Sequence, residues 1–374
     1  MARLLYATFD PVPAPKGASR HVQALVAGLV AAGHDVTLAA IGPGGEVAGA
    51  HALPFRPPPG DFLSQALAFG DHVVAVAAGF DAWHARDIWG GYPLARRGGT
   101  PLIAEINGLP SIELPYRFPA LLRHPETHAK VRAQEDAFLA AARGVLTPSS
   151  VTAAYLQARG VAPERVVVVP NGVDLAAFDH AEPPVRGWPE VLYIGTFSPW
   201  QGLETLLQAF TRVPPPTRLR LIGPDGLWGG ALRARAAGLG LADRVVFMPP
   251  VAPERMPALI RAATVAVAPL DGGPRNVEQG CCPIKLLEYM AAARPIVASA
   301  LPVVEHLVTH GREALLVPPD DPAALAVALT RLLSNPVEAR ALGDAAHARA
   351  RHYGWDASNQ AVLAAYARWE ISPA

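Results

Sequence analysis

A short segment in the last third of the chain carries a lysine and a glutamate at a spacing that suits an anion and a diol. Gly280–Met290 joins a loop rich in turn residues, Asp271–Asn276, to an expected helix that begins at Pro283. Proline suits the first helical position because no N–H partner is needed there. The next N–H groups point out of the helix start, where the dipole favours an anion. They belong to Ile284, Lys285 and Leu286.

Lys285 and Glu288 share one face of this expected helix. Lys285 adds a positive charge in the first turn, where acidic residues are otherwise preferred. Glu288 lies three residues later, roughly 4–5 Å further along the axis, and a carboxylate can accept hydrogen bonds from two vicinal hydroxyls. This offset suits a diphosphate and its attached ribose. The alternative is a solvated glutamate with Lys285 as its ion-pair partner, but the order of glycine-rich loop, proline, lysine, glutamate and apolar strand Pro295–Ser299 favours a ligand site.

Composition limits the class of protein. The 374 residues are 51% hydrophobic, with 32 Lys+Arg against 32 Asp+Glu. This size predicts two domains with substantial cores. A net charge of zero argues against electrostatic binding of nucleic acid or anionic lipid by the chain as a whole. The two cysteines, Cys281 and Cys282, are adjacent, so they give neither a disulfide framework nor metal-ligand spacing. We expect a cytoplasmic protein, since the N-terminus lacks a secretory pattern and apolar runs are short.

Short β-type runs alternate with helical stretches along the whole chain, which predicts an α/β fold with parallel sheets. A polar, proline-rich break at Phe178–Pro189 divides the pattern. We therefore predict a first domain over residues 1–178, with a final helix at 356–374 packing back on it, and a second domain over 188–355. The predicted strands are Arg3–Thr8, Val36–Ile41, Ala82–Ala85, Pro101–Ile106, Gly144–Thr147, Val166–Val169, Val191–Gly195, Arg218–Ile222, Val245–Met248, Val265–Pro269, Pro295–Ser299 and Ala314–Val317.

Three segments together resemble the retaining glycosyltransferases of family 4, which have the GT-B fold of two Rossmann-like domains with parallel sheets facing a cleft. Glu288-Tyr-Met-Ala-Ala-Ala-Arg-Pro-Ile-Val-Ala-Ser299 is similar to the family's donor-binding motif, and Lys285 fits a subgroup with Pro-x-Lys-x-x-Glu-Tyr-Met-Ala. Val168–Asp174 resembles the interdomain signature, and Val191–Gly202 the first strand and loop of the second domain.

The resemblance implies a set of donor-binding residues, and two positions depart from the family. The first family glutamate corresponds to Gly280, and Glu278 is two residues out of register. Gln201 stands where most members have Arg or Lys, so we infer that Lys285, with Arg275, supplies the missing charge. The resemblance also implies that backbone groups around Phe247–Val251 hold the nucleotide base. The implied donor-binding residues are Gly17, Gly195, Thr196, Gln201, Val251, Cys282, Ile284, Lys285, Leu286 and Glu288.

Gly17 and Asn107 are the first-domain residues that the resemblance singles out. Gly17 corresponds to a loop at the donor phosphates; taken alone, it is better explained by a turn, and the resemblance makes the two interpretations equal. Many members have a histidine at Asn107, and asparagine cannot act as a general base near neutral pH. We expect Asn107 to orient a sugar hydroxyl or the acceptor.

Further first-domain residues are candidates for the acceptor. Glu105 and Glu113 are candidates for acceptor contact; the alternative is a loop carboxylate in solvent. Ser111–Pro125, with Tyr116 and Arg117, suits an acceptor groove or interfacial patch, or buried loop packing. Arg86 could face a phosphate, and His84 is as well explained as a satisfied core residue.

These features predict a metal-independent retaining glycosyltransferase, with Asn107, Lys285 and Glu105 in catalytic roles. It would move a sugar from a UDP- or GDP-sugar to an acceptor hydroxyl in polysaccharide, glycolipid or other glycoconjugate synthesis. No cofactor is expected, because helix dipole, N–H groups and Lys285 neutralise the leaving diphosphate. Partners are the donor and a sugar, lipid-linked or small-molecule acceptor, not nucleic acid; peripheral membrane contact stays open. The alternatives are a non-catalytic nucleotide-sugar binder and a GT-B-like epimerase, while the missing glycine fingerprint after Arg3–Thr8 argues against a nicotinamide oxidoreductase.

Overall fold

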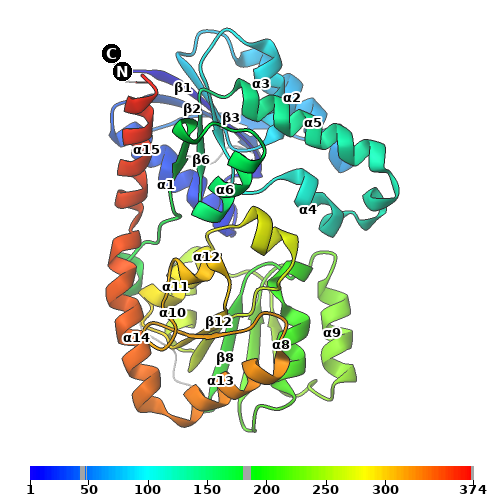
Figure 1. Cartoon of the computed structure of the whole chain (residues 1–374), viewed down its shortest axis with the longest axis vertical. Helices are drawn as coiled ribbons and strands as arrows, with labels where there is room; N and C mark the ends of the chain where they lie inside the picture. Colours follow the sequence, from blue (N-terminus) through cyan, green and yellow to red (C-terminus); the bar gives the residue numbers. More distant parts are fainter. Residues whose placement is uncertain (43–46, 48, 180–186, 372–374) are drawn as a thin grey trace. The chain divides into compact units, whose positions relative to one another are not determined.

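The computed structural model describes residues 1–374 except 43–46, 48, 180–186 and 372–374 (Figure 1). It divides into two compact units. The first comprises Met1–Asn171, Gln279–Cys281 and Trp355–Ala374, and the second comprises Gly172–Glu278 and Cys282–Gly354. Most of the predicted linker lies outside the described residues.

The second unit takes in residues 172–178, which the sequence prediction assigned to the first domain. Helix α7 (Ala176–Asp179) packs against α10 (Met256–Arg261). Phe178 is buried, and its carbonyl accepts a hydrogen bond from Arg261 Nη1 at 2.9 Å. Apolar burial and this hydrogen bond hold the segment to the second unit before the chain reaches the linker.

The first unit is built on a parallel sheet in the order β3-β2-β1-β4-β5-β6-β7. Alternate residues of β1 enter separate cores: Leu5 and Ala7 face one, and Leu4 and Tyr6 face the other. Both sheet faces are therefore covered, as parallel sheets require. The strands are β1 (Arg3–Pro11), β2 (Asp35–Ile41), β3 (His51–Phe55), β4 (Ala82–Ala85), β5 (Leu102–Glu105), β6 (Gly144–Thr147) and β7 (Val166–Val168).

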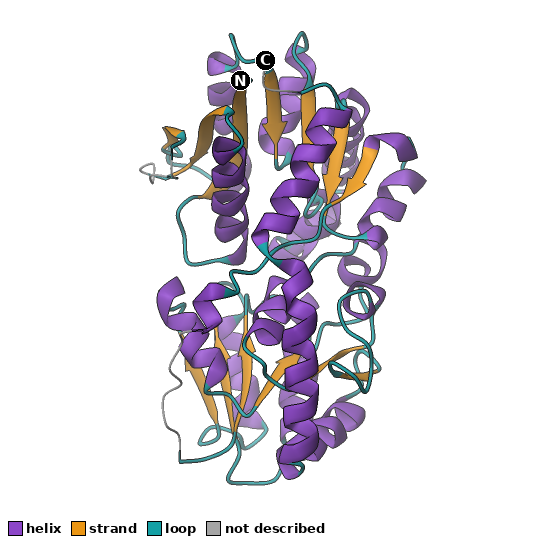
Figure 2. Ribbon diagram, turned by 90° about the vertical axis from the view of Figure 1, so that its left-hand side faces the viewer, coloured by secondary structure: helices purple, strands orange, loops and turns teal. Residues whose placement is uncertain are grey.

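Helices cover both faces of this sheet (Figure 2). Helix α15 (Trp355–Arg368) packs against α1 (Gly17–Ala31) on one face, and α2 (Phe62–Val76), α3 (Ile88–Arg97) and α5 (Pro125–Ala141) pack together on the other. The remaining helical segments of the unit are α4 (Pro110–Arg117), η1 (Pro119–Arg123), α6 (Ser150–Ala158) and η2 (Pro163–Arg165).

The second unit repeats the architecture with the parallel order β10-β9-β8-β11-β12-β13. Its strands are β8 (Glu190–Ile194), β9 (Arg218–Ile222), β10 (Val245–Met248), β11 (Val265–Ala268), β12 (Ile296–Ser299) and β13 (Leu315–Val317). Its other helical segments are η3 (Pro199–Gln201), α8 (Leu203–Phe210), α9 (Gly229–Gly238), η4 (Pro253–Arg255), α11 (Ile284–Ala291), α12 (Pro302–Glu305), α13 (Pro322–Ser334), α14 (Pro336–Ala350) and η6 (Arg351–Tyr353), with a π-helical turn, η5 (Arg275–Gln279), leading toward α11. Within the described part of the chain, no helix is long and apolar enough to cross a membrane.

These two parallel sheets confirm the predicted α/β class with two Rossmann-like domains. Each predicted strand is present, to within a few residues at its ends. The elements that the sequence did not predict include β3, α2, α3, α4, α6, α7 and α12. Two of these helices contain an internal proline, Pro93 in α3 and Pro115 in α4, which hides them from a propensity argument.

Gly144 allows a test of how Trp369, which follows α15, packs against the first sheet. A Cβ added at Gly144 would lie 2.1 Å from the buried Trp369 ring. We expect Gly144→Ala to lower the free energy of unfolding by about 1–3 kcal/mol through overpacking. Gly238→Ala, at an exposed site of α9 with no atom within 4 Å, is the control and should raise it by about 0.5–1 kcal/mol. Urea unfolding curves measure both, and a Gly144→Ala protein as stable as wild type would contradict this packing.

Candidate functional site

The second sheet reverses its strand order between β8 and β11. From this pair, the chain runs outward through β9 and β10 on one side and through β12 and β13 on the other. Ligands of open α/β sheets bind beyond the carboxyl ends of the strands at such a reversal. The loops that leave these ends, 195–202 and 269–276, are therefore the first place to look for a ligand site.

Hydrogen bonds tie these two loops together. The Asp271 N–H donates to the Trp200 carbonyl at 3.2 Å, and Asn276 Nδ2 donates to the same carbonyl at 2.7 Å. Gly202 has a φ of 67°, and a Cβ there would lie 1.7 Å from the Pro269 carbonyl oxygen. Only glycine permits this approach, so the sequence around the reversal fixes the two loops side by side.

Lys285 reaches into the loop after β8. Its Nζ donates to Tyr193 Oη at 3.0 Å and to Gln201 Oε1, and it lies 4.1 Å from the centroid of the Tyr193 ring. Burial, followed by the nearby Tyr289, holds the pKa of Tyr193 well above its usual range, so this phenol is neutral. Tyr193 and Gln201 are both uncharged, and their hydrogen bonds orient the ammonium. The inferred link between Lys285 and Gln201 is thus a direct contact.

Gly195 and Thr196 line the same corner. Gly195 has a φ of 144°, and a Cβ there would lie 2.7 Å from Lys285 Nζ and 2.8 Å from Tyr193 Oη. The Thr196 carbonyl accepts a hydrogen bond from Tyr193 Oη at 2.7 Å, and its side chain is exposed. The structure therefore brings four predicted donor residues together: Gly195, Thr196, Gln201 and Lys285.

Helix α11 is anchored to β8 by Tyr289, whose hydroxyl accepts a hydrogen bond from the Ile194 N–H at 2.9 Å. The helix starts at Ile284, so Pro283 is the residue before it, not its first residue. The Leu286 N–H donates to the Pro283 carbonyl at 2.9 Å, so the prediction that this N–H points outward unused is wrong. A tight first turn uses it.

Glu288 is 6% exposed. The alternative of a solvated helix glutamate is therefore wrong, while its role toward a ribose stays a prediction. Cys282 is buried, two residues before the helix. Val251 is half-buried in the loop after the edge strand β10.

Gly280 has a structural reason to be glycine. Its φ is 77°, in the left-handed region, and a Cβ would lie 2.8 Å from the Val151 Cβ and 3.1 Å from Ser149 Oγ. The preceding Gln279 is fully buried, with Oε1 accepting from the Leu109 N–H at 2.8 Å. Gln279–Cys281 is consequently part of the first unit, and the backbone here has no room for the glutamate of the family motif.

The first sheet reverses its strand order between β1 and β4. Asp10 lies near the end of β1, Arg86 and Asp87 directly follow β4, and Asn107 follows β5. Asp87 caps α3 by accepting from the Trp89 and Gly90 N–H groups, and it also accepts from the Phe9 N–H at 2.6 Å. Burial raises the pKa of Asp87 to about 6.

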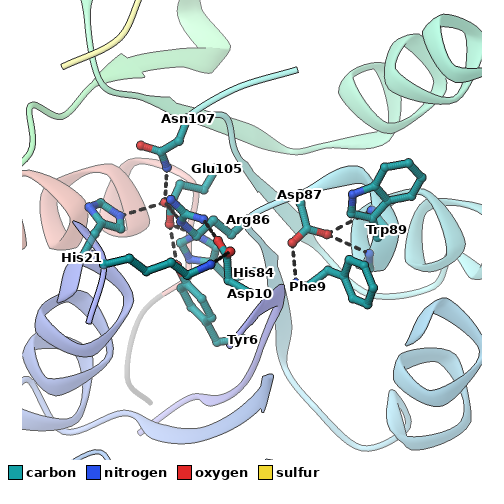
Figure 3. A network of polar contacts seen from close by, with 12 residues as sticks. Tyr6, Phe9, Asp10, His21, His84, Arg86, Asp87, Trp89, Glu105 and Asn107 are labelled. Carbon is teal, nitrogen blue, oxygen red and sulfur yellow. Dashed lines mark hydrogen bonds and ion pairs between the residues drawn. The ribbon is translucent and has the colours of Figure 1, made fainter. Parts of the chain in front are cut away.

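Glu105 is the centre of a buried polar network beside this reversal (Figure 3). It is 3% exposed, at the end of β5. One carboxylate oxygen accepts from Tyr6 Oη at 2.7 Å and lies 3.0 Å from His84 Nε2. The other accepts from Asn107 Nδ2 and lies 2.8 Å from His21 Nε2 and 3.2 Å from Arg86 Nε.

These contacts correct the sequence interpretation of Glu105. Burial alone would raise its pKa, yet His21 and His84 hold the pKa well below the usual range. A solvated loop carboxylate is therefore wrong, and so strongly ionised a group is a poor proton acceptor. His84 is a satisfied core residue, since its Nδ1 also lies 2.6 Å from Tyr366 Oη.

Asn107 lies at a small cavity of about 10 Å³, room for about one water molecule. The cavity is also lined by His21, Glu105 and Thr147. The Asn107 amide is oriented by Glu105, so its side chain is held in place rather than left to rotate. Gly17 is the first residue of α1, so it belongs to a helix start and not to a separate turn.

The acceptor candidates Glu113, Tyr116 and Arg117 lie on α4. The Glu113 carboxylate covers Gly108, where a Cβ would lie 2.2 Å from its Oε1. The exposed Arg117 stacks on Phe62, with 5.2 Å from Cζ to the ring centroid. The predicted loop Ser111–Pro125 is thus largely α4 and η1.

Sequence reasoning missed Asp10, Tyr193 and Gln279. Asp10 follows an apolar strand directly, which was a usable signal, whereas Tyr193 and Gln279 act through side-chain contacts that sequence spacing does not encode. No group of three or more His, Cys, Asp or Glu within the described ranges could hold a metal ion; metal independence stays a prediction.

Two family models match the chain, one in each of its two parts. Residues 15–177 match the model described as Glycosyltransferase Family 4, and 188–335 match Glycosyl transferases group 1. A D-inositol 3-phosphate glycosyltransferase from Frankia alni is 30% identical over 300 residues, 75% of this chain and 71% of that protein. The chain belongs to glycosyltransferase family 4. A similarly named protein from Acidothermus cellulolyticus is 32% identical over 73% of this chain, but the match spans only 63% of that relative's length.

Solved structures share the fold of this family 4 glycosyltransferase. Sucrose-phosphate synthase from Thermosynechococcus elongatus superposes with a TM-score of 0.84 at 23% identity, with all of both chains covered. The Anabaena protein HepE, solved with UDP and glucose, gives 0.78 at 18% identity, covering 98% of this chain and 100% of that one. These similarities confirm the GT-B fold.

Glu105→Gln tests the buried network through its pH dependence. We expect the free energy of unfolding at pH 7 to fall by about 3–5 kcal/mol, because a buried charge partner is lost. The pKa of Glu105 is lowered in the folded state, so its contribution is present above the ordinary value of 4.5 and is lost as pH falls through the folded pKa. The difference in the free energy of unfolding between wild type and Glu105→Gln should therefore become smaller below pH 4.5.

Asp87 acts with the opposite sign. Because the pKa of Asp87 is raised in the folded state, its contribution to the free energy of unfolding is full below pH 3.8 and is lost as the pH rises to about 6. Wild type and Glu105→Gln share this contribution, so it cancels when their free energies of unfolding are subtracted. Denaturant unfolding from pH 3 to 8 is the measurement, with the exposed Glu164→Gln as control. A difference that stays constant with pH would refute the ionised network.

Gly280→Ala and Gly280→Glu test the explanation for the departure from the family motif. Both should lower the free energy of unfolding by similar amounts, about 1–3 kcal/mol, because the cost lies in the left-handed backbone and the Cβ contact. Chemical denaturation compares the three proteins. A Gly280→Glu protein as stable as wild type would show that the glutamate had room.

Proposed function

We propose that this chain transfers a sugar from a nucleoside-diphosphate donor to an acceptor hydroxyl with retention of the anomeric configuration. The observation that carries the proposal is Lys285, held by Tyr193 and Gln201 at the β8/β11 reversal, beside the start of α11. The Anabaena structures contain UDP and UDP-glucose, which supports the same donor class here. UDP and GDP are the nucleotides to test.

Negative charge develops on the diphosphate as the bond to the sugar breaks. In the proposal, the Lys285 ammonium and the N–H groups of Ile284 and Lys285 stabilise that charge. The leaving diphosphate takes the acceptor proton on the face where the acceptor attacks, so no enzymic base is needed. This agrees with Glu105, a strongly ionised carboxylate that is committed to its own network. Glu105 then serves as a positioning residue for Asn107.

Asn107 is proposed to orient a hydroxyl of the sugar or acceptor. Glu105 fixes its amide through Nδ2, which turns the carbonyl end away from Glu105 (Figure 3). A side chain held in one orientation loses less entropy when it binds a ligand. A non-catalytic nucleotide-sugar binder is the competing function, and slow release of UDP or GDP from the donor distinguishes the transferase from it.

Lys285→Ala tests the donor site. We expect nucleoside-diphosphate affinity to fall about 10- to 100-fold, the loss of one charge-assisted hydrogen bond. Isothermal titration calorimetry with UDP and GDP measures it. Lys130→Ala, which removes an exposed lysine of α5, is the matched control and should bind as wild type does. Unchanged affinity in Lys285→Ala would refute the assigned role, and no binding of any nucleoside diphosphate by wild type would refute the proposed function.

A further inference from the structure

A second charged cluster lies at the β1/β4 reversal of the first sheet, and the proposed mechanism leaves it unused. Asp10 accepts hydrogen bonds from two cations at once. Arg86 Nη1 donates to Oδ2 at 2.6 Å, and Lys16 Nζ donates to Oδ1. The cluster is open to solvent on one side, since the side chains of Asp10 and Lys16 are 24% and 38% exposed.

Both cations of this cluster are paired with carboxylates. Lys16 pairs with Asp10, and Arg86 pairs with both Asp10 and Glu105. Arg86 lies between the two carboxylates, with its side chain only 11% exposed. Burial would raise the pKa of Asp10, but Arg86 and Lys16 hold it below its usual range. Asp10 is therefore ionised at neutral pH.

This pairing affects which groups can bind at the β1/β4 edge. A phosphate monoester carries about −1.5 to −2 charges near pH 7. A phosphate that accepted hydrogen bonds from Lys16 or Arg86 would lie beside the like charge of Asp10, and displacing Asp10 would leave that carboxylate without these partners. Both effects oppose binding. A hydroxyl group meets neither penalty, because it can donate to Asp10 and accept from Lys16.

We propose that Asp10 is a specificity-determining residue that restricts the ligand at the β1/β4 edge to an uncharged polyol, such as a free sugar, and excludes phosphate monoesters. The inference rests on the proposed function and takes this ligand to be the acceptor. It separates the chain from the relatives named D-inositol 3-phosphate glycosyltransferases. Its basis is the pairing of both cations with Asp10, not the similarity to those proteins.

The first experiment measures anion binding. Calorimetry with inorganic phosphate is carried out on proteins that all carry Lys285→Ala, so that the proposed donor site is weakened equally in each of them. Adding Asp10→Asn should tighten phosphate binding at least about tenfold, because both cations are released. Asp71→Asn, an exposed aspartate of α2, is the matched control and should change nothing. Equal affinity with and without Asp10→Asn would overturn the proposal.

The second experiment needs no variant and covers the case in which Asp10→Asn fails to fold. Ligand-observed NMR on the native protein saturated with UDP compares inositol with D-inositol 3-phosphate, and glucose with glucose 6-phosphate. The uncharged member of a pair should bind at least about tenfold more tightly. Tighter binding of the phosphate ester, or no difference in either pair, would overturn the proposal. Failure of UDP binding would instead count against the proposed function, and the phosphate titration would still report on Asp10.

Discussion

The constraint on which both candidate sites depend is the reversal of strand order in a parallel sheet. At β1/β4 and at β8/β11 the strand order reverses, and ligands of open α/β sheets bind beyond the carboxyl ends of such strands. In the second unit, Tyr193, Gln201 and Lys285 make polar contacts at this reversal. In the first unit, Asp10 and Arg86 do.

The two sites position their cations with different partners. Lys285 is oriented by a neutral phenol and a neutral amide. Arg86 lies between two carboxylates, so its charge is compensated within the protein. A cation oriented by neutral groups suits a ligand that brings its own negative charge. A cation neutralised in place serves to hold carboxylates in a fixed geometry.

Much of this organisation could be predicted from sequence, because hydrophobic runs and turn residues report directly on strands. Lys285 and Gln201 were assigned to one site, and the structure joins them. The burial of Glu105 could not be foreseen, because its partners come from β1, α1, β4 and the residue two places on, and sequence spacing does not reveal which strands are neighbours. The reason for Gly280 was equally hidden, since it depends on Ser149 and Val151, far away in the chain.

The placement of the last helix has a consequence for biosynthesis. Val362, Tyr366 and Trp369 are buried in the core that β1 and α1 form. The first unit therefore lacks part of its core until residues near the end of the chain have left the ribosome. Domains usually fold in the order of their synthesis. Here the second unit, which closes at Gly354, has all of its sequence before the first unit does, so the order of completion is the reverse of the order of translation.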